Sequence, residues 1–161
     1  MNTTDAMPLA TLSEAEALTL LGTQEVGRLV YTRRALPAII PVNYALRAGA
    51  IWIWTASSSS MAQAVRASVV AFEVDQLDPA TRAGWSVTVI GVARIIHDPS
   101  EIERARREGP EPWAAGRTEH LIKIPLQLVS GRRLRHGGPD EPETGAPAPA
   151  SDGQELARVR P

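Results

Sequence analysis

The chain has 161 residues, no cysteine and a formal net charge of −1. Its length suits one domain with a substantial core, and the lack of cysteine excludes disulfides, thiolate metal sites and a cysteine nucleophile. The balanced charge gives no general attraction to nucleic acid or to a membrane surface, and no apolar segment reaches membrane-spanning length. We therefore expect a cytoplasmic protein without nucleic-acid or membrane partners.

The composition predicts three regions. Residues 1–10 are expected to form a flexible leader, and residues 11–136 the folded domain. Residues 137–161 are rich in Pro, Gly, Ala and acidic residues, which bury too little apolar surface to fold, so we expect a disordered tail. Within the domain, Ser13 and Glu16 have the spacing of a capping box, which predicts a helix that begins after Ser13 and ends at Gly22.

Strand patterns dominate the rest of the domain. Pro41 predicts a bulge, bend or sheet edge, Ala48-Gly49 a tight hairpin turn, and Gly91 a bulge or a close backbone approach. Short helices are expected from the serine run to about Ala67, and from Asp98-Pro99 to Gly109-Pro110, and residues 76–83 are expected to be a loop. The pattern favours a closed or nearly closed antiparallel barrel of about six strands. These strands are expected over residues 26–33, 36–47, 50–55, 68–75, 84–97 and 119–133.

One stretch, residues 50–65, joins a strand to a run of hydroxyls and then to a helix. Trp52 and Trp54 belong to the strand, and Thr55 with the four serines of 57–60 forms the run. Two interpretations are open. Unpaired N–H groups at the helix start and the serine hydroxyls can bind a phosphate, with a flat aromatic ligand against the tryptophans. Alternatively, one serine only caps the helix and the others are solvated.

The side chains offer no convincing catalytic set. His97, His120 and His136 are far apart and lack metal-ligand spacing, while Glu73 and Asp75 alternate on a strand as a solvated or ion-paired face would. No nucleophile elbow, P-loop or dinucleotide fingerprint occurs. If the protein is an enzyme, a bound cofactor must therefore carry the reaction.

The order of several short motifs resembles the pyridoxamine 5'-phosphate oxidase-like family of FMN-binding split barrels, in the nitroimidazole-resistance-like or flavin/deazaflavin oxidoreductase branch. The resemblance spans residues 12–135, and it implies a mainly β fold with peripheral helices, a six-stranded antiparallel split barrel. It further implies a homodimer with FMN, or alternatively the deazaflavin F420, in a cleft at the dimer interface. The motifs lie at residues 27–31, 37–44, 52–61, 70–75, 84–91, 112–113 and 124–133.

The resemblance also implies the site residues. The strand at Pro41, Val42 and Asn43 would offer backbone groups to the isoalloxazine ring, and the segment Thr55 to Met61 would hold the phosphate. The substrate side would be lined by Trp85, Ser86 and Trp113, which the neighbouring subunit could supply. No catalytic residue or metal ligand is implied. The expected cofactor-binding residues are Pro41, Val42, Asn43, Trp54, Thr55, Ser57, Ser58, Ser59, Ser60, Met61, Trp85, Ser86 and Trp113.

One departure from the family pattern bears on function. Relatives commonly have a lysine where this chain has Ser60, and a lysine would give the phosphate a full positive charge. Arg66 or Arg28 could compensate. The expected function is thus an FMN- or F420-dependent oxidoreductase of a small organic substrate. The alternatives are a split-barrel binding protein without flavin, holding another flat ligand such as haem or none, and a purely structural or partner-binding dimer module.

Overall fold

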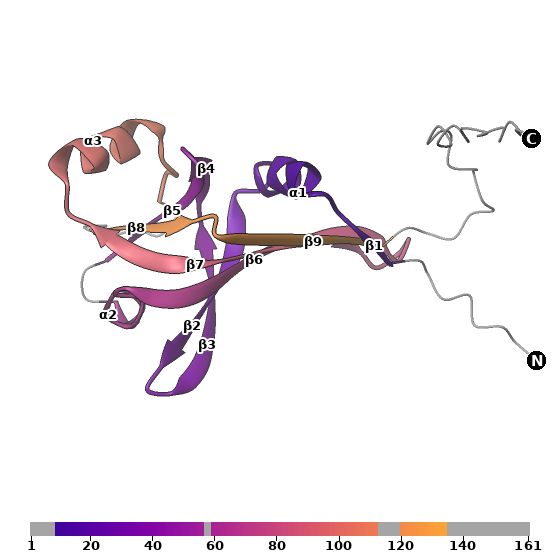
Figure 1. The fold of residues 1–161 in the computed structure, drawn as a ribbon, viewed down its shortest axis with the longest axis horizontal. Coiled ribbons are helices and arrows are strands. Elements are labelled where there is room, and N and C mark those ends of the chain that lie inside the picture. Colours follow the sequence, from indigo (N-terminus) through magenta and orange to yellow (C-terminus); the bar gives the residue numbers. More distant parts are fainter. Residues whose placement is uncertain (1–8, 57–58, 113–119, 135–161) are drawn as a thin grey trace, which may run out of the picture.

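The structure, a computed structural model, describes residues 9–56, 59–112 and 120–134. It is mainly β, with one curled antiparallel sheet and three helices in this part of the chain (Figure 1). The elements in chain order are β1 Leu9–Thr11, α1 Glu14–Leu21, β2 Val26–Arg33, β3 Leu36–Asn43, β4 Ala45–Arg47, β5 Ala50–Thr55, α2 Ser60–Ala64, β6 Ser68–Asp78, β7 Ala83–Ile96, α3 Pro99–Glu108, β8 His120–Pro125 and β9 Leu128–Leu134.

The two ends of the sheet are joined in the chain by a single residue. The strand order is β3-β2-β6-β7-β8-β5-β4, with β9 also paired to β7 and β1 to β9. The two ends of this order, β3 and β4, are consecutive in the chain and are separated only by Tyr44. At Tyr44 the chain leaves β3 at one end of the sheet and enters β4 at the other end. The Tyr44 amide donates a hydrogen bond to the Glu25 carbonyl (2.9 Å), which holds this crossing in place. The result is a split barrel, as the sequence predicted.

Two of the six predicted strands are broken at points where the chain contacts distant residues. The predicted strand 36–47 divides at Tyr44, whose ring packs inward against Phe72 and whose hydroxyl donates to the Leu21 carbonyl. The predicted strand 119–133 divides at Leu126 and Gln127, because the Gln127 side chain accepts a hydrogen bond from the Val92 amide (2.9 Å). There β7 exchanges its partner β9 for β8.

Other bounds also differ from the sequence expectations. β6 continues to Asp78, so the expected loop is only a short turn before β7. α2 ends at Ala64 with Val65 as its C-cap, so it is shorter than expected, and Ala67 lies outside it with a left-handed φ of 51°. β1 begins at Leu9, within the expected leader, and pairs with β9. Pro41 lies in β3, which pairs only with β2 among the described strands. Of the predicted bulge, bend or sheet edge at Pro41, the sheet edge is therefore confirmed.

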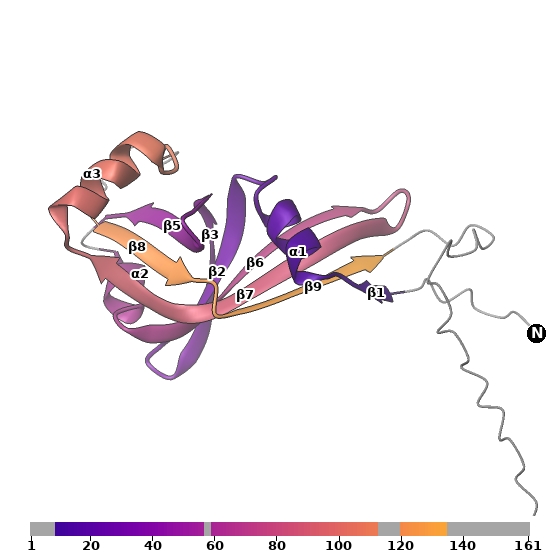
Figure 2. The ribbon, with the colours of Figure 1, turned by 45° about the horizontal axis from the view of Figure 1, so that its top comes forward.

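The helices cover the barrel at different places. α1, with its predicted capping box and its stop at Gly22, lies over β7 and β9 (Figure 2). α3 lies at the other end of the molecule, over β5 and β8 (Figure 2). The main core fills the barrel, and a smaller cluster beneath α3 joins Trp52, Leu121 and Ala105. Burial of such apolar side chains is the dominant stabilising term.

Candidate cofactor-binding site

The turn from β5 to α2 is held by two hydroxyls. Thr55 Oγ1 lies 2.9 Å from Ser59 Oγ, and Ser59 Oγ accepts a hydrogen bond from the Ala62 amide (3.0 Å). Ser59 is therefore the N-cap of α2, which is one of the two interpretations the sequence left open. Thr55 is only 6% exposed, so this pair fixes the turn from inside.

The other predicted residues of this segment are placed differently. Met61 is buried in the main core, so its side chain does not face a ligand and only its backbone could. Ser60 is the first residue of α2. Ser57 and Ser58 lie outside the described residues, as does Trp113.

The strand β3 presents a free edge. Its partner on one side is β2, and no described strand hydrogen-bonds its other side. Pro41 is exposed, Val42 packs against the core, and Asn43 is half-buried. Asn43 Nδ2 donates to the Glu111 carbonyl (2.6 Å), which ties the segment after α3 to the end of β3. The free backbone groups of this edge can pair with a ligand that carries donors and acceptors on one side.

Two hollows flank the segment Gly109–Glu111. One, of about 460 Å³, is bordered by Asn43 and Arg47. The other, of about 560 Å³, has Trp54 as a half-buried wall and Arg106 and Arg107 at its rim. The Arg106 guanidinium carbon lies 5.7 Å from the Trp54 ring centre, within the range of a cation–π contact. The second hollow therefore combines a flat aromatic surface with positive charge.

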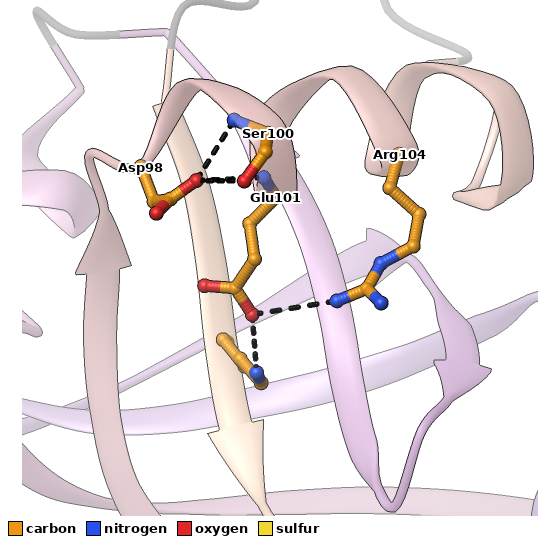
Figure 3. Close-up of polar contacts among 5 residues, drawn as sticks. Asp98, Ser100, Glu101 and Arg104 are labelled. Carbon is orange, nitrogen blue, oxygen red and sulfur yellow. Dashed lines mark hydrogen bonds and ion pairs between the residues drawn. The ribbon is translucent and has the colours of Figure 1, made fainter.

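The helix α3, which carries Arg106 and Arg107 at the rim of the second hollow, is firmly attached to the sheet. Figure 3 shows Asp98 capping α3 and Glu101 beneath it. Asp98 Oδ1 accepts from the Ser100 hydroxyl and from the Ser100 and Glu101 amides, and these hydrogen bonds, that of the Ser100 side chain first, lower the pKa of Asp98. Glu101 accepts from Lys123 Nζ of β8 (2.5 Å), so the first turn of α3 is bonded to the sheet.

A stacked pair lies next to this anchor. The Arg104 guanidinium is 5.6 Å from the centre of the Trp52 ring. Trp52 is 1% exposed, and its indole Nε1 has no hydrogen-bond partner in the part of the chain that the structure describes. Trp52 is thus a packing residue under α3, while its neighbour Trp54 faces the hollow.

Trp85 and Ser86 do not lie beside Thr55 in one protomer. Trp85 is opposite Arg133 near the start of β7, whereas Ile96 at the end of β7 is opposite Leu121, the strand neighbour of Trp54. From Trp85 to Ile96 the strand runs roughly 36 Å. Figure 1 shows these two ends of β7 at opposite ends of the barrel. Trp85 is buried in the main core, so its side chain does not face a ligand, whereas Ser86 is half-buried.

The two arginines weighed as substitutes for the missing lysine have different surroundings. Arg28 contacts Glu73 Oε2 (2.8 Å) and Asp75 Oδ1 (3.2 Å), and these carboxylates raise the pKa of the Arg28 guanidinium. Arg28 is thereby committed to the ion-paired face that the sequence allowed for Glu73 and Asp75. Arg66 borders a separate hollow of about 430 Å³ together with Arg94 and His97.

Sequence reasoning missed two features of the site. These are the contact of Arg106 with Trp54 and the contact of Asn43 with the Glu111 carbonyl, since no role was assigned to Arg106 or Glu111. Both contacts join residues distant in the chain, and no local pattern signals them. Within the described ranges, no group of histidine and acidic side chains could hold a metal ion. The same ranges contain no helix with the length and apolar character needed to cross a membrane.

Comparison with known proteins agrees with this architecture. The family model of pyridoxamine 5'-phosphate oxidase matches residues 13–133. Rv0080, an uncharacterized protein of Mycobacterium tuberculosis, is 38% identical over 134 residues, 80% of this chain and 88% of that protein.

Two solved structures are also similar. The FAD-binding protein of Mycobacterium smegmatis is 27% identical with a TM-score of 0.63, over 80% of this chain and all of that one. A Corynebacterium glutamicum protein, provisionally described as a pyridoxamine 5'-phosphate oxidase, is 30% identical with a TM-score of 0.68, over 86% of this chain and 99% of that one. The fold and the family expected from the sequence are confirmed: the chain belongs to the pyridoxamine 5'-phosphate oxidase family of split-barrel proteins.

Proposed function

We propose that this protein binds a flavin nucleotide, FMN or alternatively F420, and acts as an oxidoreductase on a small organic substrate. The observation that carries the proposal is the free edge of β3, which ends beside the two hollows at Asn43 and Trp54. The family resemblance implies that the isoalloxazine ring would bind at this edge. The similarity to the FAD-binding protein of M. smegmatis supports a flavin in general.

The residues present fit such a cofactor. The pyrimidine edge of a flavin carries both donors and acceptors, which the unpaired N–H and C=O groups of β3 can complement. Trp54 supplies an aromatic wall, and Arg106 gives it positive charge. When bound, the flavin supplies the two-electron chemistry that no side-chain set on the described chain offers. The protein would bind and orient the ring and exclude water from it.

We further propose a homodimer that completes the site. Each of the neighbouring strands β3, β2, β6, β7 and β9 contributes one apolar residue that lies directly opposite the next. Together these five residues form a continuous apolar row on the outer face of the sheet. Ile39 and Leu128, at its ends, are 60% and 59% exposed. An apolar row of this kind favours an interface. A second copy on this face would cover the row and could supply Ser86, which lies on the same face of β7 as Ile90, together with Trp113. The Trp85 side chain is buried in the core of its own protomer, so it could contribute only its backbone. The row consists of Ile39, Val30, Ala71, Ile90 and Leu128.

One observation favours a second candidate function. The Ser59 hydroxyl is used as a helix cap, and Ser60 stands where relatives have a lysine, so the phosphate contacts of this segment are weaker than in those relatives. A split barrel that holds another flat ligand such as haem, or none, would need no such contacts. The cytoplasmic location and the absence of nucleic-acid partners stay predictions from composition.

The test is the absorption spectrum and mass of the small molecule that co-purifies with the full chain. A flavin-like spectrum with the mass of FMN or F420 would support the proposal. An intense haem band would support the second candidate. Protein that carries nothing, and that also gains no thermal stability from added flavins, would refute the flavin proposal, because a ligand that binds the native state raises its stability.

A further inference from the structure

We propose that the groove between the β2–β3 hairpin and α2 binds the phosphate ester of the flavin nucleotide, with Arg33 and Arg34 supplying the charge that a lysine supplies in relatives. This inference rests on the proposed function and adds to it the residues that select a phosphorylated flavin. The groove has a volume of about 230 Å³ and is lined by Thr32, Arg33, Arg34, Gln63 and Ala64.

The hairpin geometry places both arginines at the groove. Arg33 pairs with Leu36 at the last register position of β2 and β3, so Arg34 and Ala35 form the turn between them. Both turn residues have left-handed backbone, with φ of 51° and 62°, the conformation of a tight two-residue hairpin turn. The arginines thus extend from a short two-residue hairpin beside α2 rather than from a long loop.

The charge of the groove is positive and uncompensated. No lining residue is acidic, and no ion pair joins Arg33 or Arg34 to a carboxylate among the described residues. Arg28, which lies on the same strand as Arg33, differs from Arg33 and Arg34 because it contacts two carboxylates. A guanidinium without a carboxylate partner can give both of its parallel N–H groups to a phosphate.

The groove also lies where a flavin along β3 would end. Pro41, at the proposed ring position, and Pro37, opposite Thr32, are separated by roughly 13 Å of the same strand. The ribityl chain is shorter than this separation, so the arginine side chains, which extend from the hairpin and line the groove, must cover the remainder. Gln63 belongs to α2, so the groove adjoins the segment that the resemblance assigns to the phosphate. The Thr32 hydroxyl and the Gln63 amide are neutral groups that can complete the phosphate contacts.

The experiment compares FMN with riboflavin, which has the same ring and chain but no phosphate. Flavin fluorescence titration measures the Kd of both for the full wild-type chain and for the double variant Arg33→Gln/Arg34→Gln. We expect the double variant to bind FMN about tenfold or more weakly, because charged hydrogen bonds to phosphate are lost, and to bind riboflavin unchanged. The matched control is Arg82→Gln, an exposed arginine in the turn between β6 and β7, which should leave both Kd values unchanged.

Two single variants test the sign of the charge. Gln63→Glu should weaken FMN binding and Gln63→Lys should strengthen it, again without change for riboflavin. FMN affinity should also fall with added salt more steeply in the wild-type chain than in the double variant. Thermal unfolding of each variant without flavin verifies that it is folded.

The outcomes separate this inference from the proposed function. If the wild-type chain binds FMN and riboflavin equally well, or if the double variant keeps its full preference for FMN, the groove is not the phosphate site and flavin binding itself stands. If the variants lose riboflavin and FMN to the same extent, the arginines have no role specific to phosphate. If the wild-type chain binds neither flavin, both the inference and the proposed function are refuted.

Discussion

The hydroxyl of Thr55 lies 2.9 Å from the hydroxyl of Ser59, across the turn that carries the chain from β5 into α2. Ser59 in turn caps α2 through the Ala62 amide. Two hydroxyls of the predicted phosphate segment are thus engaged in hydrogen bonds within the protein. The pair holds the turn in place, and the charge for an anion must come from other residues.

Substitution of this cap should cost stability. We expect Ser59→Ala to lower the free energy of unfolding by about 1 kcal/mol, since the Ala62 amide loses its acceptor and the buried Thr55 hydroxyl loses its neighbour. Ser59→Thr keeps the hydroxyl and serves as the control. Urea denaturation measures both variants. Equal stability of Ser59→Ala and the wild-type chain would contradict the role of the pair.

Tyr44 links the closure of the barrel to α1. Its ring lies edge-on to Phe72, with centroids 4.8 Å apart, and its hydroxyl donates to the Leu21 carbonyl. Tyr44→Phe should therefore lower the free energy of unfolding by about 1–2 kcal/mol near neutral pH, because the buried carbonyl loses its donor.

The same substitution predicts a pH dependence. Burial raises the pKa of Tyr44 above its ordinary value of 10. The unfolded chain therefore loses this proton at lower pH than the folded chain, and the stability contributed by neutral Tyr44 is full below about pH 10 and declines above it. The stability difference between the wild-type chain and Tyr44→Phe should narrow as pH rises above 10. A constant difference across that range would contradict the assignment.

Gly91 is required where β7 changes partner. A Cβ at this position would lie 2.2 Å from the Pro125 carbonyl oxygen and 3.1 Å from Ile124 Cγ2. Gly91→Ala should destabilise the fold by about 1–3 kcal/mol or more, since backbone must move. Gly22→Ala, where the nearest atom would be at 3.4 Å, is the control and should change stability by less than about 0.5 kcal/mol. Thermal unfolding measures the stability of both variants. A similar loss of stability in Gly91→Ala and Gly22→Ala would contradict the close approach of β7 to Pro125 at Gly91.

The apolar row predicts the dimer interface. Ile90 and Leu128 lie opposite each other on neighbouring strands, and both are exposed in one protomer. Ile90→Lys/Leu128→Lys should convert a dimer to a monomer, because a lysine pair cannot be buried without partners. Leu77→Lys, at an equally exposed leucine outside the row, should leave the dimer intact. Sedimentation of the variants measures this, and a dimer that persists in the double variant would place the interface elsewhere.

The sequence predicted most of the fold because its signals are local. The capping box at Ser13, the stop at Gly22, the turn at Ala48 and Gly49 and the six strand segments all follow from nearby residues, and the structure contains them. The breaks at Tyr44 and at Leu126 were not predicted. They depend on contacts with Leu21 and Phe72, and with Gly49 and Val92, that only the folded barrel creates.

The site was less predictable for the same reason. The cap at Ser59 could be anticipated from its neighbours, but the contact of Arg106 with Trp54 joins two elements far apart in the chain. Strand order also decides that Trp85 lies far from Thr55, and strand order is not written in any short motif. The groove of Arg33, Arg34 and Gln63 likewise depends on how α2 packs beside β2.

The most direct test of the central claim is a titration of the purified full chain with FMN, followed by the fluorescence of the flavin and by thermal unfolding. Flavin binding predicts saturable quenching and a midpoint that rises with flavin concentration, as linkage requires. If neither signal changes with FMN, and F420, FAD and riboflavin also leave both signals unchanged, the proposed flavin site would be contradicted.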